Sequence, residues 1–198
     1  MNQNLTKDFI FKLYHNWVTD LKKVRKYERD LYNERCFSKL KQSIIYRVLR
    51  FGLEKLGLII DDKDRRMDPG LDDIEAEIVY LLIREFKPEN IVEISPGSGW
   101  SSSWILNAIK DNKHGNLYSY DIIDKAQKFL PKNLASYSWN FFQGDIKKNL
   151  NKLPDKIDYL FIDSDHSAKF CLWYIEKLFP KLKNNTLISV HDVFRSSD

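Results

Sequence analysis

The chain has 198 residues, a length that fits one domain with an appendage, or two small domains, and that allows a sizeable buried core. Its 43% of apolar and 30% of charged residues are typical of a soluble globular protein, and no apolar run approaches the length of a membrane span. The N-terminus also lacks the basic-then-apolar order of a signal peptide, so we expect a cytoplasmic protein without a membrane span.

The net charge of +4 is unevenly distributed along the chain. Residues 1–66 hold 16 Lys or Arg against 9 Asp or Glu, whereas residues 67–198 hold 16 against 19. A basic N-terminal part could attract nucleic acid, a membrane surface or an anionic substrate. Acids interrupt the basic runs, however, as in residues 22–30, which is typical of a solvated helix face. We therefore expect no nucleic-acid partner.

Two amphipathic helices are predicted at the start of the chain. Over residues 5–32 and 38–56, apolar side chains recur at steps of three and four residues. The charged segment 60–70 has no periodicity and is broken by a Pro-Gly pair, which is typical of a linker. We interpret residues 1–70 as a helical arm or cap with its linker, through which the chain could form a homo-oligomer. The main domain is then expected at residues 71–198.

The main domain alternates between helical and strand patterns. A helix is predicted from Asp72 or Asp73 through Phe86, where Lys87-Pro88 ends it. Five strands are expected beyond it, at 91–94, 117–120, 139–142, 157–162 and 187–190. Helices are expected between them at 101–110, 124–130 and 167–179, and a short helix is expected to begin at residue 145. This alternation predicts an α/β fold, a doubly wound and mostly parallel sheet with helices on both faces.

The first strand runs into the loop Ser95-Pro-Gly-Ser-Gly99, and the serines beyond this loop begin a helix. Such a junction points backbone N–H groups and the positive end of a helix dipole at a ligand. Glycine lets that ligand approach the main chain closely. The loop therefore predicts a cofactor site.

Acids lie at or just after the end of each strand: Glu93, Asp121, Asp145, Asp163 with Asp165, and Asp192. An isolated Asp after a strand is usually a helix cap, but five such ends in succession are hard to assign to capping alone. Ligands of open α/β sheets bind beyond the carboxyl ends of the strands, so we expect these acids to lie at one site. Asp121 follows the glycine loop at the distance expected of an acid that binds ribose hydroxyls.

A ribose-binding acid would also suit an NAD(P)-binding oxidoreductase, which is one alternative. The loop lacks the third glycine of the dinucleotide pattern, the glycine that allows close helix–strand packing. A ligand with a pyrophosphate therefore fits this loop less well than a nucleoside without one.

Five motifs in order carry a family resemblance: Val92-Glu-Ile-Ser-Pro-Gly-Ser-Gly-Trp-Ser101, Leu117-Tyr-Ser-Tyr-Asp-Ile122, Gln143-Gly-Asp145, Phe161-Ile-Asp-Ser-Asp-His-Ser167 and Ser189-Val-His-Asp-Val193. They resemble class I S-adenosylmethionine-dependent methyltransferases over about residues 72–194. The most similar group is that of small-molecule and sugar O-methyltransferases related to macrocin O-methyltransferase and cephalosporin hydroxylase-like proteins. The resemblance implies methyl transfer to a hydroxyl of a sugar or other polar small molecule.

The resemblance also implies roles for the residues that match these motifs. Cofactor contacts would come from Glu93 and the backbone of Ser95, Gly97 and Gly99 to the methionine part, from Asp121 to the ribose, and from Asp145 after Gly144 to the adenine. The chain departs from the commonest loop by having Ser95-Pro96 where a first glycine often stands. Proline fixes one backbone angle and removes a donor, which predicts a stiffer loop.

Metal-dependent relatives bind a divalent cation with acids at the last two strand ends. Here Asp163 and Asp192 match those acids, with Asp165 nearby, and such oxygen ligands suit Mg²⁺. The relatives often supply a further acid or amide beside the last Asp, whereas this chain has His191 before it. A structural network of Asp and His side chains is the alternative to a metal.

Two histidines lie at the strand ends, and either could serve as general base near neutral pH. We predict that His166 is the base, with Asp163 and His191 completing the catalytic group. For each histidine the alternative is a purely structural role, bracing a neighbouring carboxylate.

The C-terminal end of the sequence motivates a third hypothesis for the function, in which a methyltransferase-like fold only binds a partner. Relatives continue after the fifth strand with a helix and two more strands, but this sequence stops at Asp198. We therefore expect a C-terminally truncated domain, or a second subunit that covers the exposed edge of the fifth strand.

Overall fold

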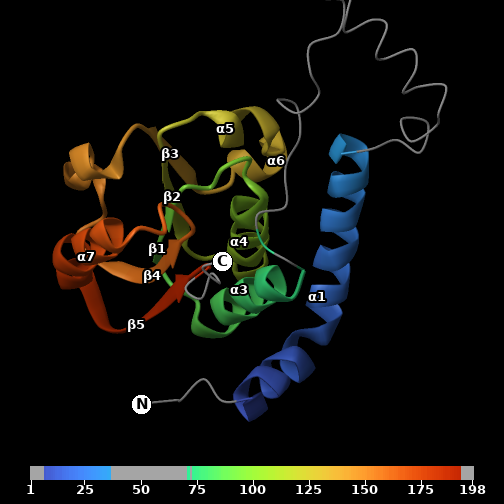
Figure 1. Ribbon diagram of the computed structural model, residues 1–198. Helices are drawn as coiled ribbons and strands as arrows, with labels where there is room; N and C mark the ends of the chain where they lie inside the picture. The colour runs from blue at the N-terminus through green and yellow to red at the C-terminus, as the bar shows by residue number, and fades with distance from the viewer. Residues whose placement is uncertain (1–6, 37–70, 72, 193–198) are drawn as a thin grey trace, which may run out of the picture.

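A computed structural model describes residues 7–36, 71 and 73–192 (Figure 1). The predicted second helix, the linker and the domain boundary at residue 70 lie outside these residues, so the division into two parts stays a prediction. The predicted first helix is present as α1 (Lys7–Cys36), and the next described helix is α3 (Asp73–Phe86). No helix in the described ranges is long and apolar enough to cross a membrane.

The described strands form one parallel sheet in the order β3-β2-β1-β4-β5, which confirms the predicted fold class. The strands are β1 (Asn90–Ile94), β2 (Asn116–Asp121), β3 (Trp139–Gln143), β4 (Ile157–Ile162) and β5 (Leu182–Val190). The connecting elements are α4 (Trp100–Asn112), α5 (Lys125–Phe129), α6 (Lys132–Ala135), α7 (Ala168–Lys177) and the short 3₁₀ turns η3 (Ile146–Lys148), η4 (Leu150–Lys152) and η5 (Phe179–Lys181).

Alternate residues of β1 face two separate cores. Ile91 packs with α1, α3 and α4 on one side of the sheet, whereas Val92 and Ile94 pack with Phe170 and Tyr174 of α7 on the other. Figure 1 shows these helices on the two faces of the sheet. This alternation is the period-two pattern of a strand. Helices on both faces make the sheet doubly wound.

The fifth strand is longer than the sequence pattern predicts. Between Leu182 and Leu187 the pairing with β4 shifts register, and Asn185 takes a left-handed conformation with φ of 65°. Thr186 Oγ1 closes this bulge by donating to the carbonyls of Ile157 and Lys183, 2.8 Å from each. Because the residues of the bulge are polar, a hydrophobic pattern does not predict this part of the strand.

Strand β5 is also an edge of the described sheet. In the part of the chain that the structure describes, no strand lies beyond it. The expectation that a further segment or a second subunit covers this edge stays a prediction.

The order of the strands reverses between β1 and β4, where the chain leaves β1 on one side for β2 and later returns on the other side for β4. Ligands of open α/β sheets bind in the crevice at such a reversal. The glycine loop follows β1 and Asp163 follows β4, and the N–H of Asp163 donates to the carbonyl of Ile94 at 3.2 Å. The fold therefore brings two of the predicted motifs together at this point.

Helix α1 is joined to the sheet domain by polar contacts as well as by an apolar face. Tyr14 donates to Glu77 at 2.9 Å, Trp17 donates to Glu85 at 3.0 Å, and Asp20 pairs with Arg84. Leu13, Leu21 and Val24 of α1 are buried in the same core as α3 and α4. The N-terminal helix is thus part of the hydrophobic core of the domain.

Glu28 continues the buried stripe of α1 and is 1% exposed. Its Oε1 accepts hydrogen bonds from Ser103 at 2.5 Å and Asn107 at 2.8 Å, both on α4. Its Oε2 is buried and has no hydrogen-bond partner within the described residues. Burial raises the pKa of Glu28 to about 7, although the bonds from Ser103 and Asn107 lower it.

Exchange of Glu28 for Gln should therefore change how stability depends on pH. The pKa of Glu28 is raised in the folded state, so its contribution to stability is fully present below its ordinary pKa of 4.5 and is lost as the pH rises through about 7. Glu28→Gln removes this loss. We expect its free energy of unfolding to exceed that of the wild type by up to about 3 kcal/mol at pH 8, and this difference to disappear near pH 4.5. Urea unfolding across this pH range measures it.

The matched control is Asp30→Asn, an acid-to-amide change at an exposed position of the same helix. We expect its difference from wild type to be small at every pH. An equal pH dependence in Glu28→Gln and wild type would contradict the account of Glu28.

Candidate functional site

The glycine loop between β1 and α4 is held in an unusual backbone conformation. Ser95, Gly97 and Gly99 all have positive φ, at 63°, 56° and 92°. Glycine adopts these angles freely, but a serine there is strained, and such strain is common at functional sites. Ser95 is held by its N–H, which donates to the carbonyl of Tyr120 at 2.8 Å, and by its hydroxyl, which donates to Ser164 Oγ at 2.8 Å.

The side chain of Glu93 holds together the elements around this loop. Its carboxylate is completely buried and accepts hydrogen bonds from Ser101 at 2.6 Å, Ser102 at 2.7 Å and Ser119 at 2.6 Å. Ser119 in turn accepts from Trp139 Nε1 at 2.9 Å. Burial raises the pKa of Glu93, while the three hydroxyls act to lower it. The carboxylate joins β1, β2 and α4, and its predicted direct contact with the cofactor stays a prediction.

Asp121 braces the other side of the loop. Its Oδ2 accepts from the N–H of Gly97 at 2.9 Å and its Oδ1 from the N–H of Ile123 at 3.1 Å. Burial raises the pKa of Asp121, and the backbone N–H groups act to lower it. A carboxylate has about four acceptor positions, so Asp121 can hold the loop and also accept from a ligand hydroxyl.

A cavity of about 220 Å³ opens over this loop. Loop residues from Ser95 to Ser98 line it together with Trp100, Ile123, Lys125 and Asp163. A Cβ placed on Gly97 would meet no atom within 4 Å, so the loop backbone faces open space there. The cavity thus offers the backbone cradle that a nucleoside cofactor needs. Gly144 and Asp145 do not line it, and Asp145 Oδ1 accepts from the N–H of Lys147 at 2.9 Å, capping η3.

A second cavity, of about 120 Å³, lies at the ends of β4 and β5. His166, His191, Asp165 and Asp192 line it, with Cys171 and Tyr174 of α7. His166 Nε2 lies 4.0 Å from Asp163 Oδ1, and Asp163 lines the first cavity. The two cavities are therefore neighbours, with Asp163 of the first beside His166 of the second.

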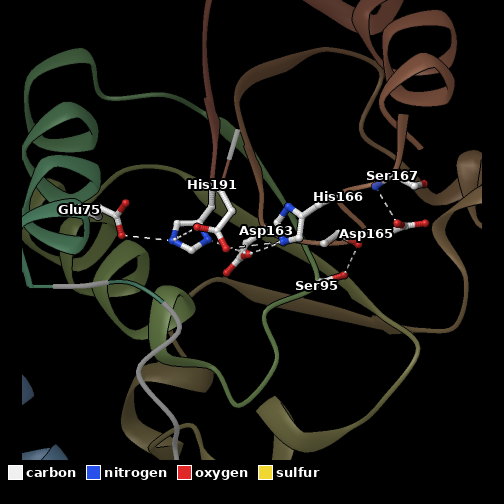
Figure 2. Close-up of polar contacts among 9 residues, drawn as sticks. Glu75, Ser95, Asp163, Asp165, His166, Ser167 and His191 are labelled. Carbon is white, nitrogen blue, oxygen red and sulfur yellow. Dashed lines mark hydrogen bonds and ion pairs between the residues drawn. The ribbon is translucent and has the colours of Figure 1, made fainter. Parts of the chain in front are cut away.

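His191 lies between two carboxylates (Figure 2). Its Nδ1 is 3.1 Å from Asp163 Oδ1, its Nε2 is 3.2 Å from Glu75 Oε2, and Asp192 Oδ1 is 3.7 Å away. Burial lowers the pKa of His191, but the nearby carboxylates of Asp163, Glu75 and Asp192 outweigh burial and raise it. His191 is thus engaged on both nitrogens, whereas His166 lies 4.0 Å from Asp163 and Asp192 and has more freedom to contact a substrate.

Sequence reasoning missed Glu75 and Glu28. Glu75 lies in the first turn of α3, and no motif around it distinguishes it from an ordinary acid at a helix start. Glu28 did carry a signal, because it follows Leu21 and Val24 at helical spacing and so lies on the buried stripe. A charged residue on such a stripe predicts a buried polar contact.

The acids suggested for a divalent cation do not converge in the structure. Asp163 Oδ1 contacts His191, and Asp165 is exposed, with its Oδ1 accepting from the N–H of Ser167 at 2.9 Å. Within the described residues, no group of three or more His, Cys, Asp or Glu side chains could hold a metal ion. As placed, these residues do not fit Mg²⁺, and its binding stays a prediction of the resemblance.

The parallel sheet, the strained glycine loop and the cavity above it define a Rossmann-like domain for a nucleoside cofactor. A family model described as a methyltransferase domain matches residues 92–193. Because this match covers half of the chain, the chain belongs to this methyltransferase-domain family. The resemblance to class I methyltransferases is confirmed. Membership of the group related to macrocin O-methyltransferase stays a prediction. Comparison with curated proteins gave no significant match.

Several solved structures share the fold. A protein assigned as a caffeoyl-CoA O-methyltransferase from Staphylococcus aureus is 24% identical, over 85% of this chain and 72% of its own, with a TM-score of 0.51. The Podospora anserina methyltransferase PaMTH1, bound to S-adenosylhomocysteine, is 14% identical over 98% and 74%, with a TM-score of 0.55. A Bacillus cereus O-methyltransferase in complex with S-adenosylhomocysteine is 15% identical over 86% and 74%, with a TM-score of 0.51.

The support that Glu93 gives to the loop can be tested with Glu93→Gln. An amide keeps the size but cannot accept from three serines in this arrangement, so buried hydroxyls lose their acceptor. We expect a loss of about 1–3 kcal/mol in the free energy of unfolding, measured by chemical denaturation. Glu89→Gln, at an exposed position before β1, is the matched control and should cost little. Equal stability of both variants would contradict the bracing role.

Proposed function

We propose that this chain is an S-adenosylmethionine-dependent O-methyltransferase whose acceptor is a hydroxyl of a sugar or another polar small molecule. The observation that carries the proposal is a pair of neighbouring cavities, in which Asp163 of the first lies 4.0 Å from His166 of the second. The first has a backbone cradle suited to a nucleoside, and the second has histidines and acids suited to a polar acceptor. Family membership and the S-adenosylhomocysteine-bound neighbours give further support.

The glycine loop at the first cavity and the strand ends near it would hold this cofactor. The backbone of Ser95, Gly97 and Gly99, beside the N-terminus of α4, would hold the methionine part, since the helix dipole favours a carboxylate there. Asp121 would accept from the ribose hydroxyls with the lone pairs left free by the loop. Asp145 after Gly144 would reach the adenine, as the family pattern implies.

The chemistry needs alignment and one proton acceptor. When bound, S-adenosylmethionine supplies a methyl group on a positively charged sulfur, which is already a strong electrophile. The protein then has to hold the acceptor oxygen in line with that methyl group and remove the hydroxyl proton. His166 would take this proton on Nε2, the nitrogen that faces Asp163 and Asp192. These two carboxylates would stabilise the imidazolium that forms.

His191 has a different role in this proposal. With Asp163 on one nitrogen and Glu75 on the other, it has no ring nitrogen left to receive a proton from the acceptor. Its place between the carboxylates suits it to hold Asp163 in position beside His166. This retains the predicted catalytic group of His166, Asp163 and His191 and divides its members between proton transfer and positioning.

Neither alternative finds a specific observation in its favour. An oxidoreductase would need a loop suited to a pyrophosphate, and this loop has Ser95-Pro96 and no third glycine. A binding module without chemistry would not need two histidines and their carboxylates around a cavity beside the cofactor site.

Calorimetric titration with S-adenosylhomocysteine tests the cofactor assignment. We expect the wild-type protein to bind it, to bind NADH much more weakly, and Asp121→Ala to lose detectable binding because both the ribose acceptor and the anchor of Gly97 are removed. The acid Asp124, which pairs with Lys128 at the surface, provides the control Asp124→Asn, which should bind normally. Unchanged affinity in Asp121→Ala would contradict the ribose assignment.

Methyl transfer tests the role of His166. With any acceptor from a panel of sugars and catechols that the wild type methylates, His166→Asn should lower kcat about 10²- to 10⁴-fold while leaving S-adenosylhomocysteine affinity unchanged. His114→Asn, at an exposed position before β2, is the matched control and should retain the wild-type rate. Full activity in His166→Asn would remove it as the base.

A further inference from the structure

One side-chain contact joins the glycine loop to the loop that carries His166. The hydroxyl of Ser95, in the loop after β1, donates to the hydroxyl of Ser164 at 2.8 Å (Figure 2). Ser164 lies in the loop between β4 and α7, two residues before His166. Ser95 lines the first cavity and Ser164 lines the second. The bond therefore connects residues of the candidate cofactor site with residues of the predicted acceptor site.

Ser95 has a side chain at a position where glycine would be less strained. Its φ of 63° is a left-handed angle, which glycine adopts without the steric cost that a Cβ brings. Within the described residues Ser95 donates two hydrogen bonds, from its N–H to the carbonyl of Tyr120 and from its hydroxyl to Ser164. Glycine could make the first bond but not the second. The contact with Ser164 therefore gives the strained serine a role that glycine could not fill.

The loop that carries His166 is held at its start and is exposed beyond it. Asp163 opens the loop, and its N–H donates to the carbonyl of Ile94 at 3.2 Å. Ser164 is half-buried and adds the bond to Ser95, whereas the five residues that follow it are exposed. Among the described contacts, this bond is the last that joins the loop to the glycine loop before His166. The position of His166 therefore depends on Ser164.

We infer that the bond between Ser95 and Ser164 is a positioning contact, through which a cofactor that orders the glycine loop also orders the loop of His166. The inference rests on the proposed function, because it concerns the same cofactor and the same base. A ligand that fixes the glycine loop fixes Ser95, and a fixed Ser95 limits the movement of Ser164. The cofactor thereby prepares the second cavity, so the acceptor binds more tightly once the cofactor is in place. By linkage, a bound acceptor tightens cofactor binding by the same factor.

The strength of this coupling is limited by the bond that carries it. The net contribution of one hydrogen bond between neutral groups changes an equilibrium by about tenfold at most. We therefore expect the two sites to influence each other by about three- to tenfold. Amide exchange in the loop of His166 should change by a similar factor when the bond is removed, because exchange from an exposed loop reports its local opening.

Amide hydrogen exchange, followed by NMR at residues 163–168 of the ligand-free protein, tests the positioning. Ser95→Gly and Ser164→Ala each remove one hydroxyl of the contact, and each should speed this exchange by about three- to tenfold. The double variant should exchange no faster than either single variant, because both changes remove the same bond. Ser164→Thr keeps a hydroxyl and should retain the wild-type rates. The matched control is Ser136→Ala, at an exposed position after α6, which should also retain them.

Saturation with S-adenosylhomocysteine tests whether the contact transmits order. In the wild type we expect slower exchange at residues 95–99 and also at 164–168. In Ser164→Ala the slowing should remain at 95–99 and be lost at 164–168. With an acceptor that the wild type methylates, Ser164→Ala should lower kcat by up to about tenfold and change the KM for the cofactor less, because its effect is on the placement of His166.

Additive effects of Ser95→Gly and Ser164→Ala on exchange in the ligand-free protein would overturn the inference, because the two hydroxyls would then act independently. Equal slowing at residues 164–168 in Ser164→Ala and the wild type would do the same. So would a wild-type protein in which the ligand slows only residues 95–99. Failure of the proposed function is seen separately, as a lack of S-adenosylhomocysteine binding in the calorimetric titration, and the exchange of the ligand-free variants does not depend on it.

Discussion

The buried carboxylate of Glu93 is the interaction on which the rest of the site depends. A carboxylate without partners would be costly in this interior, so the hydroxyls of Ser101, Ser102 and Ser119 must stay within hydrogen-bond distance of it. Those hydroxyls belong to α4 and β2, while Glu93 belongs to β1. One side chain therefore fixes the strand, the helix and the neighbouring strand around the glycine loop. The positive φ angles of this loop persist because its two ends cannot move apart.

The same reversal of strand order that creates the loop cavity also brings the end of β4 beside it. Asp163 is thereby shared between the cofactor side and the histidine pocket, and His191 ties it to Glu75 of α3. Helix α3 is in turn held by α1, through Glu77 and Arg84 among others. The N-terminal helix, which looks like an appendage in the sequence, thus supports the helix that helps to position His191.

Local patterns explain which predictions succeeded. The five strands, α3, α4 and the glycine loop follow from periodicity and turn chemistry, which nearby residues determine. The predicted length of β5 was wrong because the bulge of this strand carries polar residues around Asn185, and hydrophobic patterning excludes such residues from a strand. The contacts of Glu28 and Glu75 were missed because their partners lie on other elements, at Ser103 and His191. Only packing brings those elements together.

The sequence by itself determined the class of fold and the order of its motifs, because hydrophobic period, glycine and strand-end acids are properties of short segments. It also placed Asp121 at the end of the second strand, and its role in binding a ligand stays a prediction. The tertiary structure alone decided how the acids are used. It assigned Glu93 to three serines, enclosed His191 between Asp163 and Glu75, and left His166 facing the pocket. The physical reason is that the partner, burial and charge of an ionisable side chain depend on which distant elements pack around it.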